Sequence, residues 1–454
     1  MKGEKGNFLN IMSAPPYLLL IFIEDMKSYI RFMKLSPSTS KQLKFIASAA
    51  LGATLYWQWQ TRQSVHYANS YSFQLKRYSA TAEYPNLIRH SNLMAKYLTP
   101  QLYAKLRDRI TPSGFTIDDA IQVGIDNPGM LSRQYFGIVA GDEASYKIYS
   151  ELFDPVIKAR YNHASGARQY HDFDYEKLKY PTLDNDNSNK YILSSRIRLT
   201  RNLKNFSFPS FCTRGERRII ESKLEKCFQN LIQNDEYDKK YTGSYYRLLT
   251  LDERLQEKLV NDGIFLFKPM SMSWLSSGIA RDWPDGRSLY FNQDKDFYAW
   301  INQKDHLRLI SWSKNNSISD LKIVIKTLFD GLNLLETNMN SNDLAFAHDD
   351  HFGFLTTCPV NIGTGLKYNI YLKLPNLAKD IRLPTIIKEL NLNMEEIIGL
   401  DDKVSDDCID ISNKDRIGKT EVEIIQHVLD SVTKLIEMEK KLESGEKLDK
   451  FFHS

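Results

Sequence analysis

Arginines in three separate segments have the side-chain type that phosphate binding requires. Arg196 and Arg198 are two residues apart in an apparent strand, so both side chains would project from one face. Arg308 and Arg416 stand in two later segments. A guanidinium makes planar bidentate contacts with phosphate oxygens, and two of them on one face suit a polyphosphate. Taken alone, an arginine pair of this kind is more often solvated or salt-bridged at a surface.

Cys358 is a second candidate for chemistry, because it lies just before the glycine turn Gly363-Thr364-Gly365. That turn lacks the Gly-Lys-Ser/Thr that completes a Walker loop, so no Walker motif is predicted. A lone cysteine is usually a small buried hydrophobe, whereas a thiol near several arginines would have a lowered pKa. The spacing of the cysteines predicts neither a metal site nor a disulfide framework, and the four are Cys212, Cys227, Cys358 and Cys408.

The composition is that of an ordinary globular protein. Of the 454 residues, 42% are hydrophobic and 26% are charged, and the formal net charge is only +4. This small charge implies no global surface for polyanions. The aromatic residues are spread along the whole chain, which is more typical of core packing than of a base-stacking face. We therefore expect no nucleic-acid partner.

The elements that must position these residues fall into a helical part and a mixed part. Thr99 and Thr116 are suited to cap helices, with Pro100 in the first turn of the earlier one. Runs of alternating or β-branched residues predict strands at 191–199, 288–292, 306–312, 352–358 and 368–374. Long helices are predicted at 317–333 and 420–443. A small helical domain followed by an α+β domain with a substantial sheet is the expected architecture.

The domain boundaries follow from composition. Residues 182–190 are almost purely polar and read as a linker. We predict a helical N-terminal domain at 83–181 and a C-terminal domain at 191–454, preceded by a leader at 1–82.

The leader differs in kind from the rest of the chain. Between Met26 and Ala82 there is no Asp or Glu, whereas lysines and arginines recur. An acid-free, basic and partly amphipathic stretch favours an organelle import signal. The apolar runs at 17–23 and 45–57 are shorter than the ~20 residues that span a bilayer. Two alternatives stay open: a signal anchor built on 45–59, and a leader that is disordered or begins before the true start.

Motifs in order along residues 83–454 resemble the phosphagen (ATP:guanidino) kinases, and creatine kinases most closely. The matching segments include Asp126-Asn127-Pro128-Gly129, Leu193-Ser194-Ser195-Arg196, Arg281-Asp282-Trp283-Pro284, Thr357-Cys358-Pro359 and Asp410-Ile411-Ser412-Asn413. The leader and the segment Glu83-Tyr84-Pro85-Asn86-Leu87 favour the mitochondrial branch. The resemblance implies a helical domain joined to a larger domain with an antiparallel sheet flanked by helices.

The resemblance also implies an activity, which is reversible phosphoryl transfer between Mg·ATP and a guanidino compound such as creatine. The implied nucleotide contacts are Arg196, Arg198, Arg308 and Arg416, with Lys367 at another arginine position. Cys358 would be the thiol of the substrate site, and Trp300 stands at the family's tryptophan position. Phe136 replaces the valine that meets the methyl group of creatine, and it would shrink that pocket.

Two departures reverse charge at the implied substrate contacts. The family motif Asn-Glu-Glu-Asp-His-x-Arg reads Asn302-Gln303-Lys304-Asp305-His306-Leu307-Arg308 here, so the glutamate that grips the guanidinium is Lys304. Two unit charges about 4 Å apart at an effective dielectric of ~20 interact by about 4 kcal/mol, and here the sign is repulsive. The nucleotide loop Arg-Gly-Thr-Gly-Gly-Val-Asp aligns with 395–401, which places Glu395 where the family has an arginine.

Two hypotheses follow. The favoured one is a creatine kinase-like protein with weak or lost catalysis, in which ATP or ADP with Mg is the cofactor if nucleotide binding is retained. The alternative is an active guanidino kinase in which Asp305 or Glu396 compensates. In either case we expect a homodimer, with octamers less supported. A mitochondrial location is expected, including association with its membrane, and a cytoplasmic or membrane-anchored protein is the alternative.

Overall fold

The computed structural model describes residues 78–129, 135–164, 166–180, 190–233, 239–313, 318–395 and 407–446. Contacts between residues divide the chain into Met1–Ser79 and Ala80–Ser454. In the first unit only Tyr78 and Ser79 are described, so the predicted import signal and signal anchor lie outside the described residues. No helix within the described ranges is long and apolar enough to cross a membrane.

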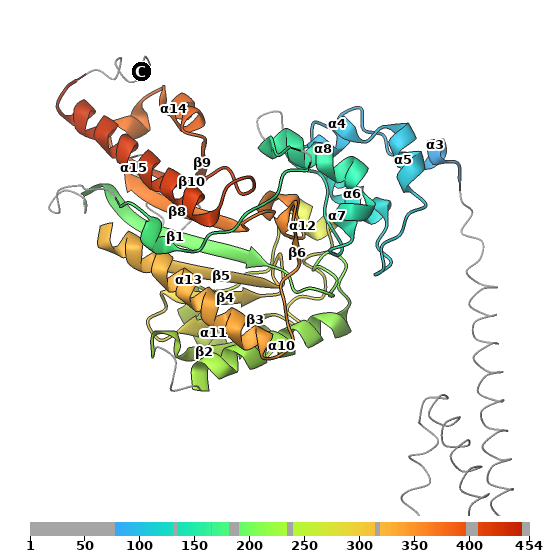
Figure 1. Cartoon of the computed structure of the whole chain (residues 1–454), viewed down its shortest axis with the longest axis horizontal. Helices are drawn as coiled ribbons and strands as arrows, with labels where there is room; N and C mark the ends of the chain where they lie inside the picture. Colours follow the sequence, from blue (N-terminus) through green and yellow to red (C-terminus); the bar gives the residue numbers. More distant parts are fainter. Residues whose placement is uncertain are drawn as a thin grey trace, which may run out of the picture. The chain divides into compact units, whose positions relative to one another are not determined.

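The first part of this unit is helical, as predicted (Figure 1). The helices are α3 (Ala80–Glu83), α4 (Leu93–Tyr97), α5 (Pro100–Leu106), α6 (Ile117–Asp126), α7 (Ser145–Ile148) and α8 (Ser150–Tyr161). The predicted caps are confirmed, because the hydroxyl of Thr99 accepts from the backbone N–H of Leu102 and Thr116 forms a capping box with Asp119.

The second part is built on an eight-stranded sheet with the order β2-β3-β4-β5-β1-β8-β10-β9. All neighbouring strands are antiparallel. Their bounds are β1 (Ile192–Arg201), β2 (Gly243–Arg247), β3 (Ser288–Asn292), β4 (Phe297–Ile301), β5 (Leu307–Ser313), β8 (Leu366–Lys373), β9 (Leu392–Glu395) and β10 (Cys408–Asn413). A separate hairpin pairs β6 (His348–Asp349) with β7 (Gly353–Phe354).

Three long helices cover one face of the sheet (Figure 1), namely α10 (Arg214–Gln233), α13 (Ile318–Asn340) and α15 (Glu421–Glu443). The main hydrophobic core lies between them and the strands. On the opposite face, α11 (Glu253–Asn261) closes a smaller apolar cluster. Shorter helices are α12 (Met272–Ser276) and α14 (Leu383–Glu389), and 3-10 turns occur at Tyr175–Lys177, Lys239–Tyr241, Leu248–Thr250, Pro359–Asn361 and Leu377–Lys379.

The strand β1 explains how the arginines come together. Ile197 and Leu199 are fully buried in the main core, so the alternate positions Arg196 and Arg198 face the other way. In the pairing register, Arg198 lies opposite Lys367 of β8, and Thr200 lies opposite Arg308 of β5. The predicted shared face is therefore confirmed, and it gathers basic side chains from three neighbouring strands.

The predicted strand at 352–358 is wrong apart from the two residues of β7. Its backbone groups bond elsewhere: the N–H of Leu355 donates to Ala347, and the N–H of Thr357 donates to the carboxylate of Asp305. The alternation of apolar residues here reflects packing of a buried loop. The loop contacts the helical part, because Tyr146 donates its hydroxyl to the carbonyl of Thr356 at 2.6 Å.

The helical part and the sheet part share one hydrophobic cluster. It joins residues of α4 to α8 with Phe352, Leu355, Ile362 and Ile417 from the C-terminal half. Leu178, in turn, packs in the core of the sheet. Of the predicted linker 182–190 only Lys190 is described, and the predicted domain boundaries stay predictions.

Candidate functional site

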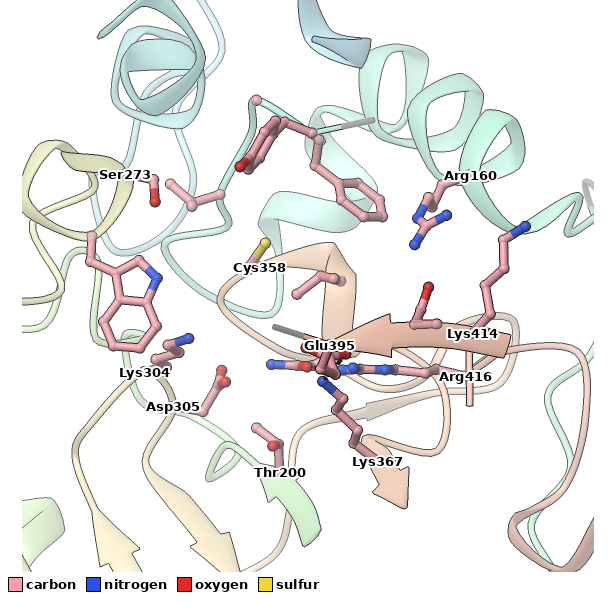
Figure 2. Close-up of a pocket in the computed structure, with 18 of the residues that line it drawn as sticks. Arg160, Thr200, Ser273, Lys304, Asp305, Cys358, Lys367, Glu395, Lys414 and Arg416 are labelled. Atoms are coloured by element: carbon pink, nitrogen blue, oxygen red, sulfur yellow. Dashed lines mark hydrogen bonds and ion pairs between the residues drawn. The ribbon is translucent and has the colours of Figure 1, made fainter. Parts of the chain in front are cut away.

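A cavity of about 800 Å³ lies over the polar face of the sheet, under the helical part. Its walls come from the segment 135–139, α8, α12, β1, β5, the loop around Cys358, β8, α14, β9 and the segment 414–416. Most of these elements are far apart in sequence. Figure 2 shows how the labelled side chains surround the space, with Lys304 and Ser273 on one side and Lys414 and Arg416 on the other.

The cavity is strongly basic. Its basic lining residues are Arg160, Arg198, Lys304, Arg308, Lys367, Lys388, Lys414 and Arg416. The acidic residues among the described lining are Asp305 and Glu395. This excess of positive charge is local, because the whole chain carries a net charge of only +4. The cavity therefore suits a ligand with several negative charges.

The arginines are buried close together. Burial is the main cause that lowers the pKa of Arg198 well below its ordinary value and that of Arg308 to about 10. The guanidinium of Arg416 donates to the side-chain oxygen of Asn361, and Arg308 donates to that of Gln303 at 3.0 Å. The Nε atoms of Arg196 and Arg308 are buried, and neither has a hydrogen-bond partner among the described residues. Orphaned donors of this kind fit phosphate oxygens as their missing acceptors.

Lys367 and Glu395 form an ion pair in this basic region, with 2.5 Å between Nζ and Oε1. The hydroxyl of Ser412 donates to the same carboxylate oxygen at 3.0 Å. Burial, and then the charges of Arg198 and Arg416, lower the pKa of Lys367 to about 7. Burial acts to raise the pKa of Glu395, but Lys367 holds it below the usual value. Glu395 therefore neutralises a cation that would otherwise face the cavity.

Lys304 lies at the other end of the cavity, with its ammonium 3.1 Å from the centroid of the Trp274 ring. No acidic residue in the described ranges forms a salt bridge with it. Burial, and then the charges of Arg308 and Arg198, hold the pKa of Lys304 well below its ordinary value.

We call Ser273, Trp274, Lys304 and Cys358 the Lys304 end of the cavity. Lys367, Glu395, Lys414 and Arg416 form the Glu395 end (Figure 2).

Asp305 follows Lys304 in the chain, and its charge acts on Cys358 of the Lys304 end. One carboxylate oxygen of Asp305 accepts from the side-chain amide of Asn202 at 2.8 Å and from the N–H of Thr357 at 2.7 Å. The other oxygen, Oδ2, is buried without a hydrogen-bond partner. Asp305 therefore fixes the loop that carries Cys358.

The expected lowering of the Cys358 thiol pKa is wrong. Burial raises the pKa to about 11, and the nearby carboxylate of Asp305 adds to the rise. The bond from the backbone of Val360 and the charges of Lys304 and Arg416 act the other way but are outweighed. Lys304 and Arg416 are close enough to act on the thiol, but the burial of the thiol itself outweighs their charges. At neutral pH Cys358 is therefore a thiol.

The structure brings most, but not all, of the predicted site residues to the cavity. Arg198, Lys304, Arg308, Cys358, Lys367 and Arg416 line it, together with Phe136. Phe136 is 5% exposed, and its ring centroid is 5.9 Å from that of Tyr161, so its ring forms part of the cavity wall. Arg196 and Trp300 are not among the lining residues. The indole N–H of Trp300 instead donates to the carbonyl of Ile264 at 3.0 Å.

Several lining residues were not singled out from the sequence as site residues. They are Arg160 on α8, Trp274 on α12, Lys388 on α14 and Lys414, two residues before Arg416. None belongs to a motif with a chemical signature by itself. The described residues contain no group of three or more His, Cys, Asp or Glu side chains that could hold a metal ion.

Two family models match the chain. The model described as "ATP:guanido phosphotransferase, C-terminal catalytic domain" matches residues 220–442, and the one for the N-terminal domain matches residues 88–158. The chain belongs to the ATP:guanido phosphotransferase family. Creatine kinase B-type from Gallus gallus is 41% identical over 384 residues, which are 84% of this chain and 98% of that protein. Creatine kinase M-type from Oryctolagus cuniculus is 40% identical over the same shares of the two chains.

Solved structures agree with this membership in the ATP:guanido phosphotransferase family. A lombricine kinase crystal structure has 33% sequence identity and a TM-score of 0.76, and the match covers 83% of this chain and 100% of that one. The duplicated taurocyamine kinase from Schistosoma mansoni with bound transition-state-analogue components has a TM-score of 0.70 at 28% identity; the match covers 82% of this chain and 49% of that one. The predicted guanidino kinase fold, with a helical N-terminal domain and an antiparallel sheet flanked by helices, is confirmed.

Proposed function

We propose that this protein keeps the nucleotide end of a creatine kinase-like site while its guanidino phosphotransfer is weak or lost. The observation that carries the proposal is the position of Lys304. Its ammonium lies in the cavity against Trp274, where the resemblance implies a glutamate that would hold the substrate guanidinium. A guanidinium brought to this place finds an amine in place of a carboxylate, and the protonated form of that amine repels it by about 4 kcal/mol at close range.

The chain's own residues suit the nucleotide. Mg·ATP would supply the transferable phosphoryl group and a metal that neutralises part of its charge. Arg198, Arg308 and Arg416 would hold the phosphate oxygens. The buried Nε of Arg308, which has no hydrogen-bond partner among the described residues, supports this assignment. Glu395 weakens the same end, because it already occupies Lys367. We therefore expect nucleotide binding that is retained but weaker than a fully basic site would give.

An active guanidino kinase is the second candidate, and one observation favours it. The Oδ2 atom of Asp305 is a buried acceptor without a partner, beside Cys358 and at the cavity wall. A guanidinium could satisfy it if the side chain turned toward the cavity. The carboxylate is held in place through its other oxygen by Asn202 and Thr357, so this turn would break two hydrogen bonds. Glu396, the other compensating candidate, lies outside the described residues.

Calorimetric titration of the full chain with Mg·ADP and Mg·ATP tests the proposal, followed by a coupled phosphotransfer assay with a panel of guanidines. The Lys304→Glu, Glu395→Arg double variant is measured beside the wild type. We expect the wild type to bind nucleotide without appreciable turnover, and the double variant to bind nucleotide more tightly and to gain guanidine-dependent turnover. Wild-type turnover at 1–100 s⁻¹, a usual range for kinases, would establish the second candidate instead.

We also propose that residues 1–82 direct the protein to mitochondria. The support is the absence of acidic residues from Met26 to Ala82 in a basic stretch. A fusion of residues 1–82 to a fluorescent protein should enter mitochondria and become shorter. A fusion that stays full-length and resists carbonate extraction would indicate the signal anchor, and a diffuse one a cytoplasmic protein.

A homodimer is proposed from the family alone. Light scattering of the purified chain distinguishes a monomer from a dimer or an octamer. We expect the dimer, and a monomer at micromolar concentration would reject it.

A further inference from the structure

Lys304, at its end of the cavity, forms no salt bridge within the described residues, although the charge of Asp305 acts to favour its protonated form. The ammonium rests on an aromatic face rather than on a carboxylate, and cation–π attraction is weaker than a buried ion pair. Asp305, which follows Lys304 in the chain, accepts hydrogen bonds from Asn202 and Thr357 with one carboxylate oxygen. Its other carboxylate oxygen is buried. Gln303, next to Lys304, is bonded to Arg308. An anion at this place would therefore favour the protonated form of Lys304, which burial and the neighbouring arginines oppose.

The rest of this end is suited to a small ligand with few hydrogen bonds. The Cys358 thiol is neutral, Phe136 and Val360 add apolar wall, and Ser273 places a hydroxyl at the lining. A phosphate dianion needs several donors, which the arginines of the cavity supply and this end does not. A carboxylate needs one cation and one or two donors. It is also planar and about as large as a guanidinium.

We propose that the Lys304 end binds a small carboxylate, so that the second ligand of this protein is an anion where the family's is a guanidinium cation. This inference rests on the proposed function only in that the nucleotide occupies the remainder of the same cavity. The ammonium of Lys304 forms an ion pair with the carboxylate, while Trp274 holds the lysine chain in place. Ser273 donates its hydroxyl to the second oxygen.

Binding of acetate and of methylguanidinium to the full chain tests the inference. Both probes are small and planar, and each carries one methyl group whose signal reports binding in saturation-transfer NMR titrations. We expect acetate to bind at least tenfold more tightly than methylguanidinium. Lys304→Met should weaken acetate at least tenfold and relieve the repulsion of methylguanidinium, and Lys304→Glu should reverse the preference.

The matched control is Lys105→Met, which removes one positive charge from an exposed side chain outside the cavity lining. It should leave both affinities within twofold of the wild type. Acetate affinity should also fall as pH rises, since only the protonated amine attracts the anion. The charged groups that face this amine are Arg308, Arg198 and Asp305, together with the Cys358 thiol.

Equal binding of the two probes, or tighter binding of methylguanidinium, would overturn the inference. Acetate binding that survives unchanged in Lys304→Met would also overturn it, because the anion would then sit at the arginines. Melting temperatures of the variants show whether they are folded, and Lys304→Gln is the second variant if Lys304→Met is not. A Mg·ADP titration on the same samples keeps the two proposals apart: nucleotide binding without acetate binding rejects this inference alone.

Discussion

At the scale of single residues, the ion pair between Lys367 and Glu395 sets how much positive charge the nucleotide meets. The carboxylate occupies the lysine at 2.5 Å. We predict that Glu395→Gln frees the ammonium for phosphate and tightens Mg·ADP binding about tenfold, or about 1.4 kcal/mol. The free energy of unfolding should change by no more than about 1 kcal/mol, since the glutamate side chain is 34% exposed. Calorimetry measures the affinity for Mg·ADP. Lys367→Met is the control in the opposite direction, because it removes the ammonium that Glu395→Gln makes available to phosphate. Unchanged affinity would mean that the phosphates lie elsewhere.

A second prediction at this scale concerns His306 and acid stability. Burial lowers the pKa of its imidazole to about 3, and the ring accepts from Leu203 and donates to Ser207. In the unfolded chain the pKa returns to its ordinary value of about 6.5. Between these values the unfolded state binds the proton and the native state does not. Stability is therefore complete above pH 6.5 and falls with acidification by up to about 1.4 kcal/mol per pH unit.

Urea unfolding at pH 7, 6, 5 and 4 measures this slope. The His306→Gln variant should be less stable at pH 7, because it loses buried hydrogen bonds. Its free energy of unfolding should change less steeply with pH than that of the wild type, by an amount that corresponds to nearly one bound proton. Parallel slopes for the two proteins would assign the acid sensitivity to other groups.

At the scale of elements, the glycine turn before β8 fixes the position of Arg416. Gly363 has φ +92°, and a Cβ on it would lie 2.2 Å from the carbonyl oxygen of Arg416. The same carbonyl accepts from the N–H of Thr364 at 2.7 Å. We predict that Gly363→Ala lowers the free energy of unfolding by about 3 kcal/mol or more, since both the backbone angle and the space oppose it. Nucleotide affinity should fall as well, because Arg416 moves.

Gly215→Ala is the matched control. Gly215 lies in α10 and no atom would approach its Cβ within 4 Å. The substitution should stabilise the helix by about 0.5–1 kcal/mol. Chemical denaturation measures the change in the free energy of unfolding for both variants, which should be a decrease for Gly363→Ala and an increase for Gly215→Ala. An unchanged free energy of unfolding for Gly363→Ala would show that the turn relaxes without cost.

At the scale of the whole molecule, the helical part and the sheet part should unfold together. One hydrophobic cluster contains residues of both, and the loop around Cys358 is bonded to the helices. Tyr146 is 3% exposed and donates its hydroxyl to the carbonyl of Thr356, and Tyr161 donates to that of Val360 at 2.8 Å. We predict that Tyr146→Phe lowers the free energy of unfolding by about 1–3 kcal/mol while keeping a single transition.

Differential scanning calorimetry tests this cooperativity. Tyr170→Phe is the control, since Tyr170 is 66% exposed and its change should be within about 0.5 kcal/mol. Two separate transitions in the wild type would mean that the shared cluster does not couple the two parts.

Much of this molecule could be predicted from the order of its residues. Thr99 and Thr116 cap helices because capping depends on the next three residues, which the sequence shows directly. The alternation in β1 placed Arg196 and Arg198 on one face for the same local reason. The loop at 352–358 was wrongly predicted as a strand, because an alternating apolar pattern also arises where a loop is buried between two layers.

The sequence by itself determined the family and which residue types stand at the motif positions. Only the tertiary structure decided what those residues do. Lys367 and Glu395 are 28 positions apart, yet they form an ion pair across β10. The Cys358 thiol stays protonated because the fold withdraws it from water more strongly than its basic neighbours attract a thiolate. Charge, burial and pairing depend on distances through space, and a sequence gives distances along the chain alone.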